Sequence, residues 1–160
     1  MFGFFRRRSA AADAEAARLF AHVKRQLRAS GQLDSGAVSP AAKSFWVHDY
    51  MMGLTIEAER AGRLRRTDSR RAFVDFMVNV MGLPLSAAQS CYATSRGHCR
   101  SNPKNEAFLA GIADAEALLS GAIAQTPLLA QFRMPGENAE GSAAVILATD
   151  ERPGDLKPLS

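Results

Sequence analysis

The stretch FWVHDYMMGLTI, at residues 45–56, decides the fold class of this chain. Its apolar residues cover most of the circumference of a helix, and a helix that is apolar on nearly all sides lies at the centre of a bundle. Ser39 and Pro40 predict where this helix starts, with Ser as the cap and Pro at the first helical position. Gly53 lowers the helix propensity by about 1 kcal/mol, and its missing side chain would allow another helix to approach closely.

In the sequence, segments with one apolar face come before and after this central helix. In each of them, apolar residues recur every three or four positions, which is the helical period. We therefore predict an all-α protein, a compact bundle of about five helices in one domain at residues 9–133. The expected helices cover residues 9–29, 40–62, 69–81, 87–96 and about 103–124, with a loop at residues 31–38.

Capping residues and glycines predict where the third and fourth helices start and end. Thr67 or Asp68 would cap the third helix. Ser86 would start the fourth helix as the first residue of a capping box, and Gly97 would end it. The segment 69–96 would then consist of a helix, a glycine turn and a short second helix.

Length and composition exclude several classes of protein. The chain has 160 residues and is 47% hydrophobic, so it can build a core without disulfides. It contains no run of about 18 apolar residues, so we expect no transmembrane segment. Two cysteines do not make a disulfide scaffold, and the N-terminus lacks the charge-first order of a signal peptide. We therefore expect a cytoplasmic protein with reduced thiols.

Charge divides the chain into two parts of opposite sign. The net charge is +4, but residues 1–133 carry 18 Lys and Arg against 11 Asp and Glu, a net +7. Residues 134–160 carry 2 against 5, a net −3. This Pro- and Gly-containing segment is expected to be a flexible tail that screens the basic body, and its apolar island at 143–148 would dock on the body or on a partner. The basic body favours an anionic partner, and ordinary solubility charge is the alternative.

No group of residues has the spacing that catalysis or metal binding requires. Cys91, His98 and Cys99 lack the paired short spacings of a zinc site, and the pair His48 and Asp49 has no further ligands in a supporting pattern. The sequence also lacks a nucleophile elbow. A reactive Cys99 thiol, activated by neighbouring basic groups, is one hypothesis. We expect a protein that is not an enzyme and needs no cofactor and no metal.

The leading hypothesis is a protein that acts by binding another protein, as an adaptor, a regulator or an immunity-type protein. Aromatic and arginine side chains are the usual hot spots of such interfaces. The segment 1–8 also suits peripheral contact with an anionic lipid surface, because apolar rings enter the headgroup boundary while Arg meets the lipid charge. The candidate partner-binding residues are Phe4, Phe5, Arg6, Arg7, Arg8, Arg63, Arg65 and Arg66.

The alternative hypothesis is a DNA-binding transcriptional regulator. The turn at residues 80–86 resembles the turn of bacterial helix-turn-helix motifs, in which a Gly ends the first helix and a capped second helix enters the major groove. Gln and Arg on that helix would read base edges, and arginines within residues 60–71 would contact phosphates. The candidate DNA-binding residues are Arg70, Arg71, Gln89, Ser90, Thr94 and Arg96.

Overall fold

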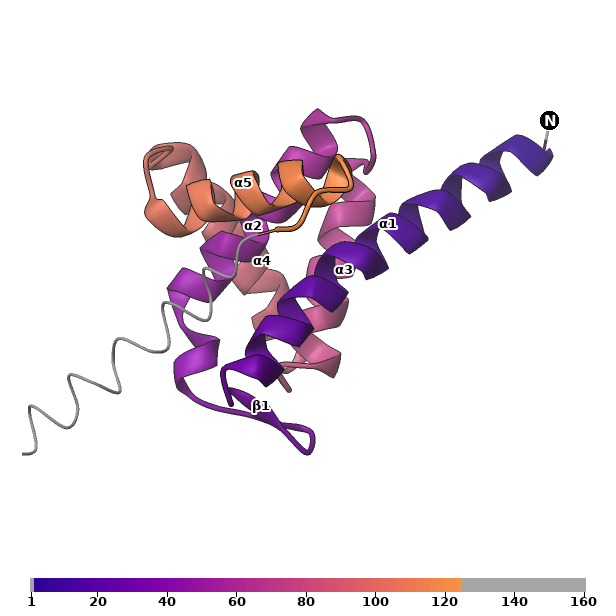
Figure 1. Cartoon of the computed structure of the whole chain (residues 1–160). Coiled ribbons are helices and arrows are strands. Elements are labelled where there is room, and N and C mark those ends of the chain that lie inside the picture. The colour runs from indigo at the N-terminus through magenta and orange to yellow at the C-terminus, as the bar shows by residue number, and fades with distance from the viewer. Residues whose placement is uncertain (1, 125–160) are drawn as a thin grey trace, which may run out of the picture.

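Five helices form one bundle in the computed structural model, which describes residues 2–124, with side chains from Ala10 onward (Figure 1). The prediction of an all-α bundle of about five helices is confirmed. Within residues 2–124, no helix combines the length and the hydropathy that crossing a membrane requires. The expected tail at 134–160, its island at 143–148 and the last residues of the expected domain lie outside the described residues. In chain order the elements are α1 (Phe2–Ala29), β1 (Leu33–Asp34), β2 (Ala37–Val38), η1 (Ala41–Lys43), α2 (Phe45–Arg60), α3 (Arg66–Asn79), α4 (Leu85–Ser101) and α5 (Glu106–Leu119).

The first helix starts earlier than the sequence pattern indicated. The predicted helix at 9–29 had a separate segment before it, whereas α1 is continuous from Phe2 to Ala29. Residues 2–8 contain no proline, and adding residues to an existing helix is easier than nucleating one. The N-terminal turns of α1 extend away from the other helices (Figure 1).

A minimal β-hairpin lies where a loop was expected. The two-residue strands β1 and β2 pair antiparallel, with Leu33 opposite Val38. The turn residues Ser35 and Gly36 have φ angles of 38° and 91°, as a two-residue hairpin turn with both angles positive requires. Leu33 is buried, so the hairpin is attached to the core while it reverses the chain between α1 and α2.

The start of the central helix also differs from the expectation. Ser39 lies before the short η1, whose N-cap residue is Pro40, and the Ser39 Oγ accepts a hydrogen bond from the Ala42 amide at 3.2 Å. Ser44 then has extended backbone with ψ at 157°, which separates η1 from α2. The predicted helix at 40–62 is therefore two elements.

The third helix starts at Arg66 and not at about residue 69. Arg65 is its N-cap residue, and Asp68 Oδ2 accepts a hydrogen bond from the Arg65 amide at 3.2 Å. The predicted cap at Thr67 or Asp68 is therefore wrong. Asp68 instead satisfies a free amide from three positions inside the helix, where a carboxylate also meets the positive end of the helix dipole.

The fourth helix is longer than predicted at both ends. It starts at Leu85, directly after Pro84, so Ser86 is not its cap. It also continues through Gly97 to Ser101. Gly97 is exposed, and a glycine inside a helix costs only about 1 kcal/mol, which the surrounding residues of a 17-residue helix offset. Arg96 and Arg100 therefore lie on one continuous helix.

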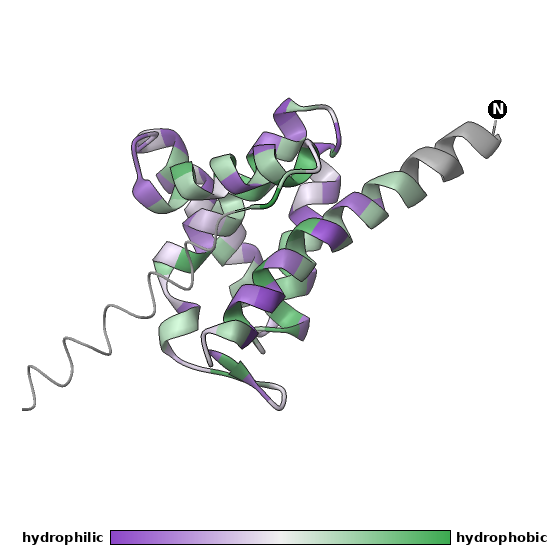
Figure 2. Cartoon of the chain, in the orientation of Figure 1, coloured by the Kyte–Doolittle hydropathy of each residue, from purple (hydrophilic) through white to green (hydrophobic). Residues whose placement is uncertain are grey.

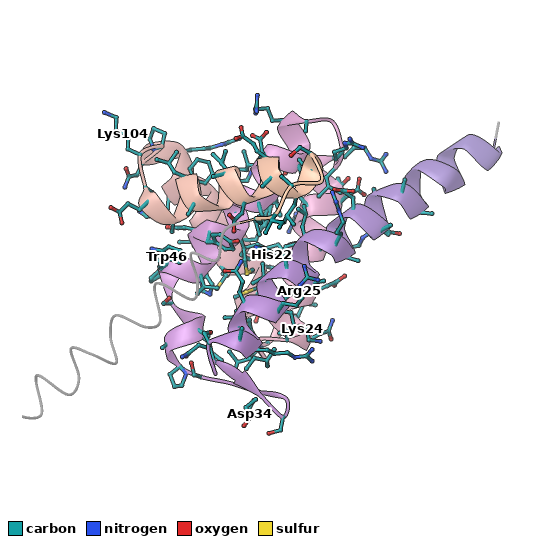
Figure 3. All side chains as sticks on the ribbon, viewed as in Figure 1. His22, Lys24, Arg25, Asp34, Trp46 and Lys104 are labelled. Carbon is teal, nitrogen blue, oxygen red and sulfur yellow. The ribbon has the colours of Figure 1, made fainter. Side chains whose placement is uncertain are left out.

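The central position of α2 is confirmed by its burial. The side chains of Val47, Met51 and Leu54 are fully buried, and α2 packs against each of the other four α-helices. The outer helices have one buried side: hydrophobic and hydrophilic residues alternate along α1 (Figure 2). On that helix, His22 points into the bundle while Lys24 and Arg25 lie on its outer side (Figure 3).

Gly53 permits the close approach that its position in α2 suggested. A Cβ atom built at Gly53 would overlap the Phe108 carbonyl oxygen and lie 3.0 Å from the Gly111 Cα. A Cβ atom at Gly111 would in turn overlap the Tyr50 carbonyl oxygen. The backbones of α2 and α5 are therefore in direct contact, with no room for a side chain between them.

A polar network is buried between α1, α2 and α5. The Tyr50 hydroxyl donates to Asp114 Oδ2 at 2.7 Å and accepts from Gln26 Nε2 at 3.0 Å. His22 Nε2 lies 3.1 Å from the same Asp114 oxygen and also contacts Gln26. Burial, followed by the hydrogen bond to Asp114, raises the pKa of Tyr50 far above its usual range. The network thus holds a neutral phenol against a carboxyl group in the core.

Candidate functional site

Four arginines of α3 and α4 meet at a groove on the surface. On α4, Gln89, Arg96 and Arg100 are separated by seven and four positions and therefore lie on one side of the helix. On α3, Arg66 and Arg70 are four positions apart and face them. The groove has a volume of about 300 Å³. We call it the arginine groove, lined by Arg66, Arg70, Gln89, Tyr92, Ala93, Arg96, Gly97 and Arg100.

Arg96 is held in place at the base of the arginine groove. Its two terminal nitrogens donate to the Glu59 carboxylate of α2, at 3.0 and 2.8 Å, and one of them also donates to the Tyr92 hydroxyl at 3.1 Å. The hydrogen bonds to Glu59 raise the pKa of Arg96, and burial opposes this effect. Tyr92 packs edge-on against Phe73 in the core, with ring centroids 5.5 Å apart. The charge of Arg96 is thus balanced by the protein itself.

The other three arginines of the groove carry unbalanced charge. Arg66, Arg70 and Arg100 are exposed, and none of them forms an ion pair with any residue whose side chain the structure describes. Guanidinium groups bind planar anions such as carboxylates and phosphates through paired hydrogen bonds. The arginine groove is therefore suited to bind an anionic ligand.

The remaining arginines of the predicted cluster lie elsewhere. Arg65 is paired with Asp68, 3.1 Å from its Nε, and Arg71 is paired with Asp13 of α1 at 2.6 Å. Arg63 is exposed beside α1, in a depression that it lines with Glu15 and others. Of the predicted loop arginines Arg63, Arg65 and Arg66, only Arg66 reaches the arginine groove.

The predicted DNA-binding residues are also divided. Arg70, Gln89 and Arg96 line the arginine groove, whereas Arg71 faces α1. Ser90 and Thr94 are exposed on α4 outside the groove. Sequence reasoning missed Arg100, because the predicted helix ended before it. Arg100 lies four positions after Arg96, so a predicted helix that continued through Gly97 would have placed both arginines on one side of it.

The larger depression between α1 and α3 has a different character. It has a volume of about 530 Å³ and includes Asp13, Arg71 and Asp75 in its lining. Arg71, its single arginine, is paired with Asp13 and lies 3.5 Å from Asp68. This depression therefore offers no unbalanced positive charge, and the arginine groove is the stronger candidate.

For the candidate partner-binding residues near the N-terminus, the structure describes only the backbone. Residues 4–8 belong to the first turns of α1, and their side chains lie outside the described part of the structure. The expected contacts of Phe4, Phe5, Arg6, Arg7 and Arg8 with a protein or a lipid surface stay predictions.

A second polar cluster surrounds Asp49 of α2. Asp49 Oδ2 accepts hydrogen bonds from His98 Nδ1 at 2.7 Å and from Asn105 Nδ2 at 3.0 Å. The neighbouring His48 is buried, and burial lowers its pKa against the opposing effect of Asp49, so His48 is neutral at pH 7. Among the described residues, no three His, Cys, Asp or Glu side chains are arranged to hold a metal ion. Asp49 thus connects α2 to α4 through His98 and to the N-cap residue of α5 through Asn105.

The structure contradicts the hypothesis of an activated Cys99. Its side chain is buried, with 2% of the residue exposed. Burial, with a smaller effect of the nearby Asp49 charge, raises the pKa of Cys99 to about 12. The neighbouring basic residues do not lower it, because Arg96 is paired with Glu59 and Arg100 is exposed to solvent.

Cys99 should therefore be alkylated far more slowly than a free thiol. In a Cys91→Ser variant, the rate of reaction with iodoacetamide between pH 7 and 9 should be at least about tenfold below that of a free cysteine, because the thiolate is the reacting species. Mass spectrometry of the alkylated peptide would measure it. Unfolding in urea should restore the full rate. A folded protein that reacts as fast as free cysteine would contradict the assignment of Cys99 to the core.

Comparison with protein families, with curated proteins and with solved structures finds no match to this chain.

Proposed function

We propose that this is a non-enzymatic binding protein that uses the arginine groove to hold an acidic segment of a protein partner. The observation that carries the proposal is the convergence of Arg66, Arg70 and Arg100 on one groove without a counter-charge among the described residues. Other arginines of the same region, such as Arg65 and Arg71, are paired. Positive charge that the fold leaves unpaired in a concave site favours a negatively charged ligand.

The dimensions of the groove support a short segment as its ligand. A volume of about 300 Å³ lies at the lower end of ligand-binding pockets, so it holds a few side chains rather than a folded surface. Ala93 and Gly97 leave the wall low, which allows a peptide backbone to lie across α4. Tyr92 and the arginines are residue types enriched in binding hot spots. An adaptor, a regulator or an immunity-type protein would have such a surface.

Duplex DNA is the second candidate ligand. Its support is that Arg70, Gln89 and Arg96, three of the six residues expected to contact DNA, line the same groove. Against it, a helix-turn-helix protein reads bases with the N-terminal residues of its second helix. Residues 85–90 of α4 carry no charge, and Arg96 is already bound to Glu59. This distribution favours the acidic protein segment.

An Arg70→Glu variant should weaken binding of an acidic peptide. With a fluorescent ten-residue polyglutamate as the probe, the dissociation constant at low salt should rise by about fivefold or more, because one ion pair is lost and a repulsion is added. Arg25→Glu is the matched control, since Arg25 is exposed on α1 outside the groove and the charge change is the same. Fluorescence anisotropy measures both. An equal loss in the two variants would mean that net charge, and not the arginine groove, determines binding.

The same assay with a random 20-base-pair duplex separates the two candidates. Binding of DNA through phosphate contacts weakens steeply with salt, in proportion to the number of contacts. DNA binding tighter than peptide binding, and lost in Arg70→Glu only, would favour the regulator. Peptide binding without measurable DNA binding at low salt would favour the protein partner.

A further inference from the structure

We infer that, without a partner, the arginine groove is occupied by the acidic C-terminal segment of the same chain, residues 134–160. This inference rests on the proposed binding role of the groove and adds a means of regulating it. The partner would then compete with a segment that is always present. Three observations support it: the charges of the two parts, the position where α5 ends, and the length of chain that follows.

The charges of the groove and the segment are complementary. Arg66, Arg70 and Arg100 have no acidic partner among the described residues. Residues 134–160 carry five acidic residues against two basic ones. The acidic residues form two groups in the sequence, residues 137–140 and residues 150–155. Either group presents two or three carboxylates over a few positions, which matches three guanidinium groups within one groove.

Helix α5 ends on the side of the bundle where α3 begins. Leu118 and Leu119, at the end of α5, pack against the cluster that contains Leu64. Leu64 precedes Arg66, the first residue of α3, by two positions. Glu116 also lies 3.4 Å from Arg60 at the end of α2. Helix α5 therefore ends close to the end of the groove that Arg66 lines. The chain then turns back at Gly121, where the Ala122 amide bonds to the Ala117 carbonyl oxygen, and residues 120–124 run back along the bundle (Figure 1).

The following segment is long enough to reach every arginine of the groove. Twelve residues separate Ala124 from Glu137, and an extended chain covers up to about 3.5 Å per residue, or roughly 40 Å. The 17-residue helix α4 is only about 26 Å long. A tethered segment at this distance has an effective concentration on the order of millimolar, so even weak ion pairs would keep the groove occupied for part of the time.

NMR of the full chain tests the contact without any added ligand. In the unmodified protein, amide chemical shifts of residues 137–155 should differ from those of an isolated 134–160 peptide. In an Arg66→Glu/Arg70→Glu variant they should move to the values of the isolated peptide. The matched control is Arg25→Glu/Arg28→Glu, which makes the same charge change on exposed residues of α1 and should leave the shifts unchanged. Circular dichroism would verify that both variants keep their helices.

Shifts in the unmodified chain that already equal those of the isolated peptide would overturn the inference. Equal changes in both variants would also overturn it, because they would report net charge only.

Peptide binding distinguishes this inference from the proposed function. A full-length variant with Glu137→Gln, Glu140→Gln, Asp150→Asn, Glu151→Gln and Asp155→Asn should bind the polyglutamate probe about fivefold more tightly than the unmodified chain, because the competing segment is neutral. If the shifts respond as expected but this variant does not bind the probe, the internal contact stands and the proposed partner binding fails. If the unmodified chain and this variant bind the probe equally well, partner binding stands and the internal contact fails.

Discussion

A Gly53→Ala substitution is expected to lower the free energy of unfolding by about 3 kcal/mol, at the upper end of the usual cost of overpacking. The added methyl group would overlap the carbonyl oxygen of Phe108 and lie 3.0 Å from the Cα of Gly111. Both neighbouring groups are backbone, so no side chain can rotate away to make room. The helices α2 and α5 would have to separate along their whole contact.

Gly97→Ala provides the matched control for this effect. Gly97 is also inside a helix, but a Cβ atom there meets nothing within 4 Å. Because alanine has the higher helix propensity, this substitution should raise the free energy of unfolding by up to about 1 kcal/mol. Urea unfolding followed by circular dichroism measures both variants. The two substitutions should change the free energy of unfolding in opposite directions. A destabilisation of similar size in both variants would mean that the overlap with the backbone of α5 is not the cause.

An Asp114→Ala substitution should also destabilise the protein by about 3 kcal/mol, because it leaves buried polar groups without their partner. The Asp114 carboxylate accepts a hydrogen bond from the Tyr50 hydroxyl at 2.7 Å and lies 3.1 Å from His22 Nε2. All of these groups are buried, so water does not readily replace the lost hydrogen bonds. Glu116→Ala removes an acidic side chain two positions along α5 at an exposed site and should change stability by less than about 0.5 kcal/mol.

A double-mutant cycle with Tyr50→Phe identifies the network as the cause. If the hydroxyl and the carboxylate stabilise the fold together, the effects of the two substitutions are not additive, and the coupling should amount to about 1 kcal/mol or more. Urea unfolding of the two single variants and the double variant gives this value. Additive effects would show that Asp114 acts independently of Tyr50.

The bundle itself was predictable because its signals are local. Each helix repeats its apolar residues at the helical period, and the all-round apolar sequence at 45–56 identified the central helix. The absence of a side chain at Gly53 was likewise visible without knowing which helix would contact it. Only the structure shows that Gly53 contacts Gly111 of α5, because small residues occur in other helices as well.

The candidate site was predictable only in part, because pairing depends on residues far apart in the sequence. Arg96 and Arg71 look alike in the sequence, yet Glu59 lies against one and Asp13 against the other. Arg66 and Arg100 remain unpaired because α3 and α4 place them where the described structure has no acid. The C-terminal end of α4 was also mispredicted, because the sequence alone does not distinguish a glycine inside a helix from a glycine that follows one.

The length of α1 has a consequence for how the molecule moves in solution. Its 28 residues make a rod of about 42 Å, whereas the other α-helices have 14 to 17 residues and are no longer than about 26 Å. Because part of this rod lies beyond the bundle (Figure 1), the molecule has one long axis and resists end-over-end rotation more than rotation about that axis. Backbone amides of α1, whose bonds run along the rod, therefore report the slowest tumbling of the whole protein, and a sphere of equal mass would rotate faster.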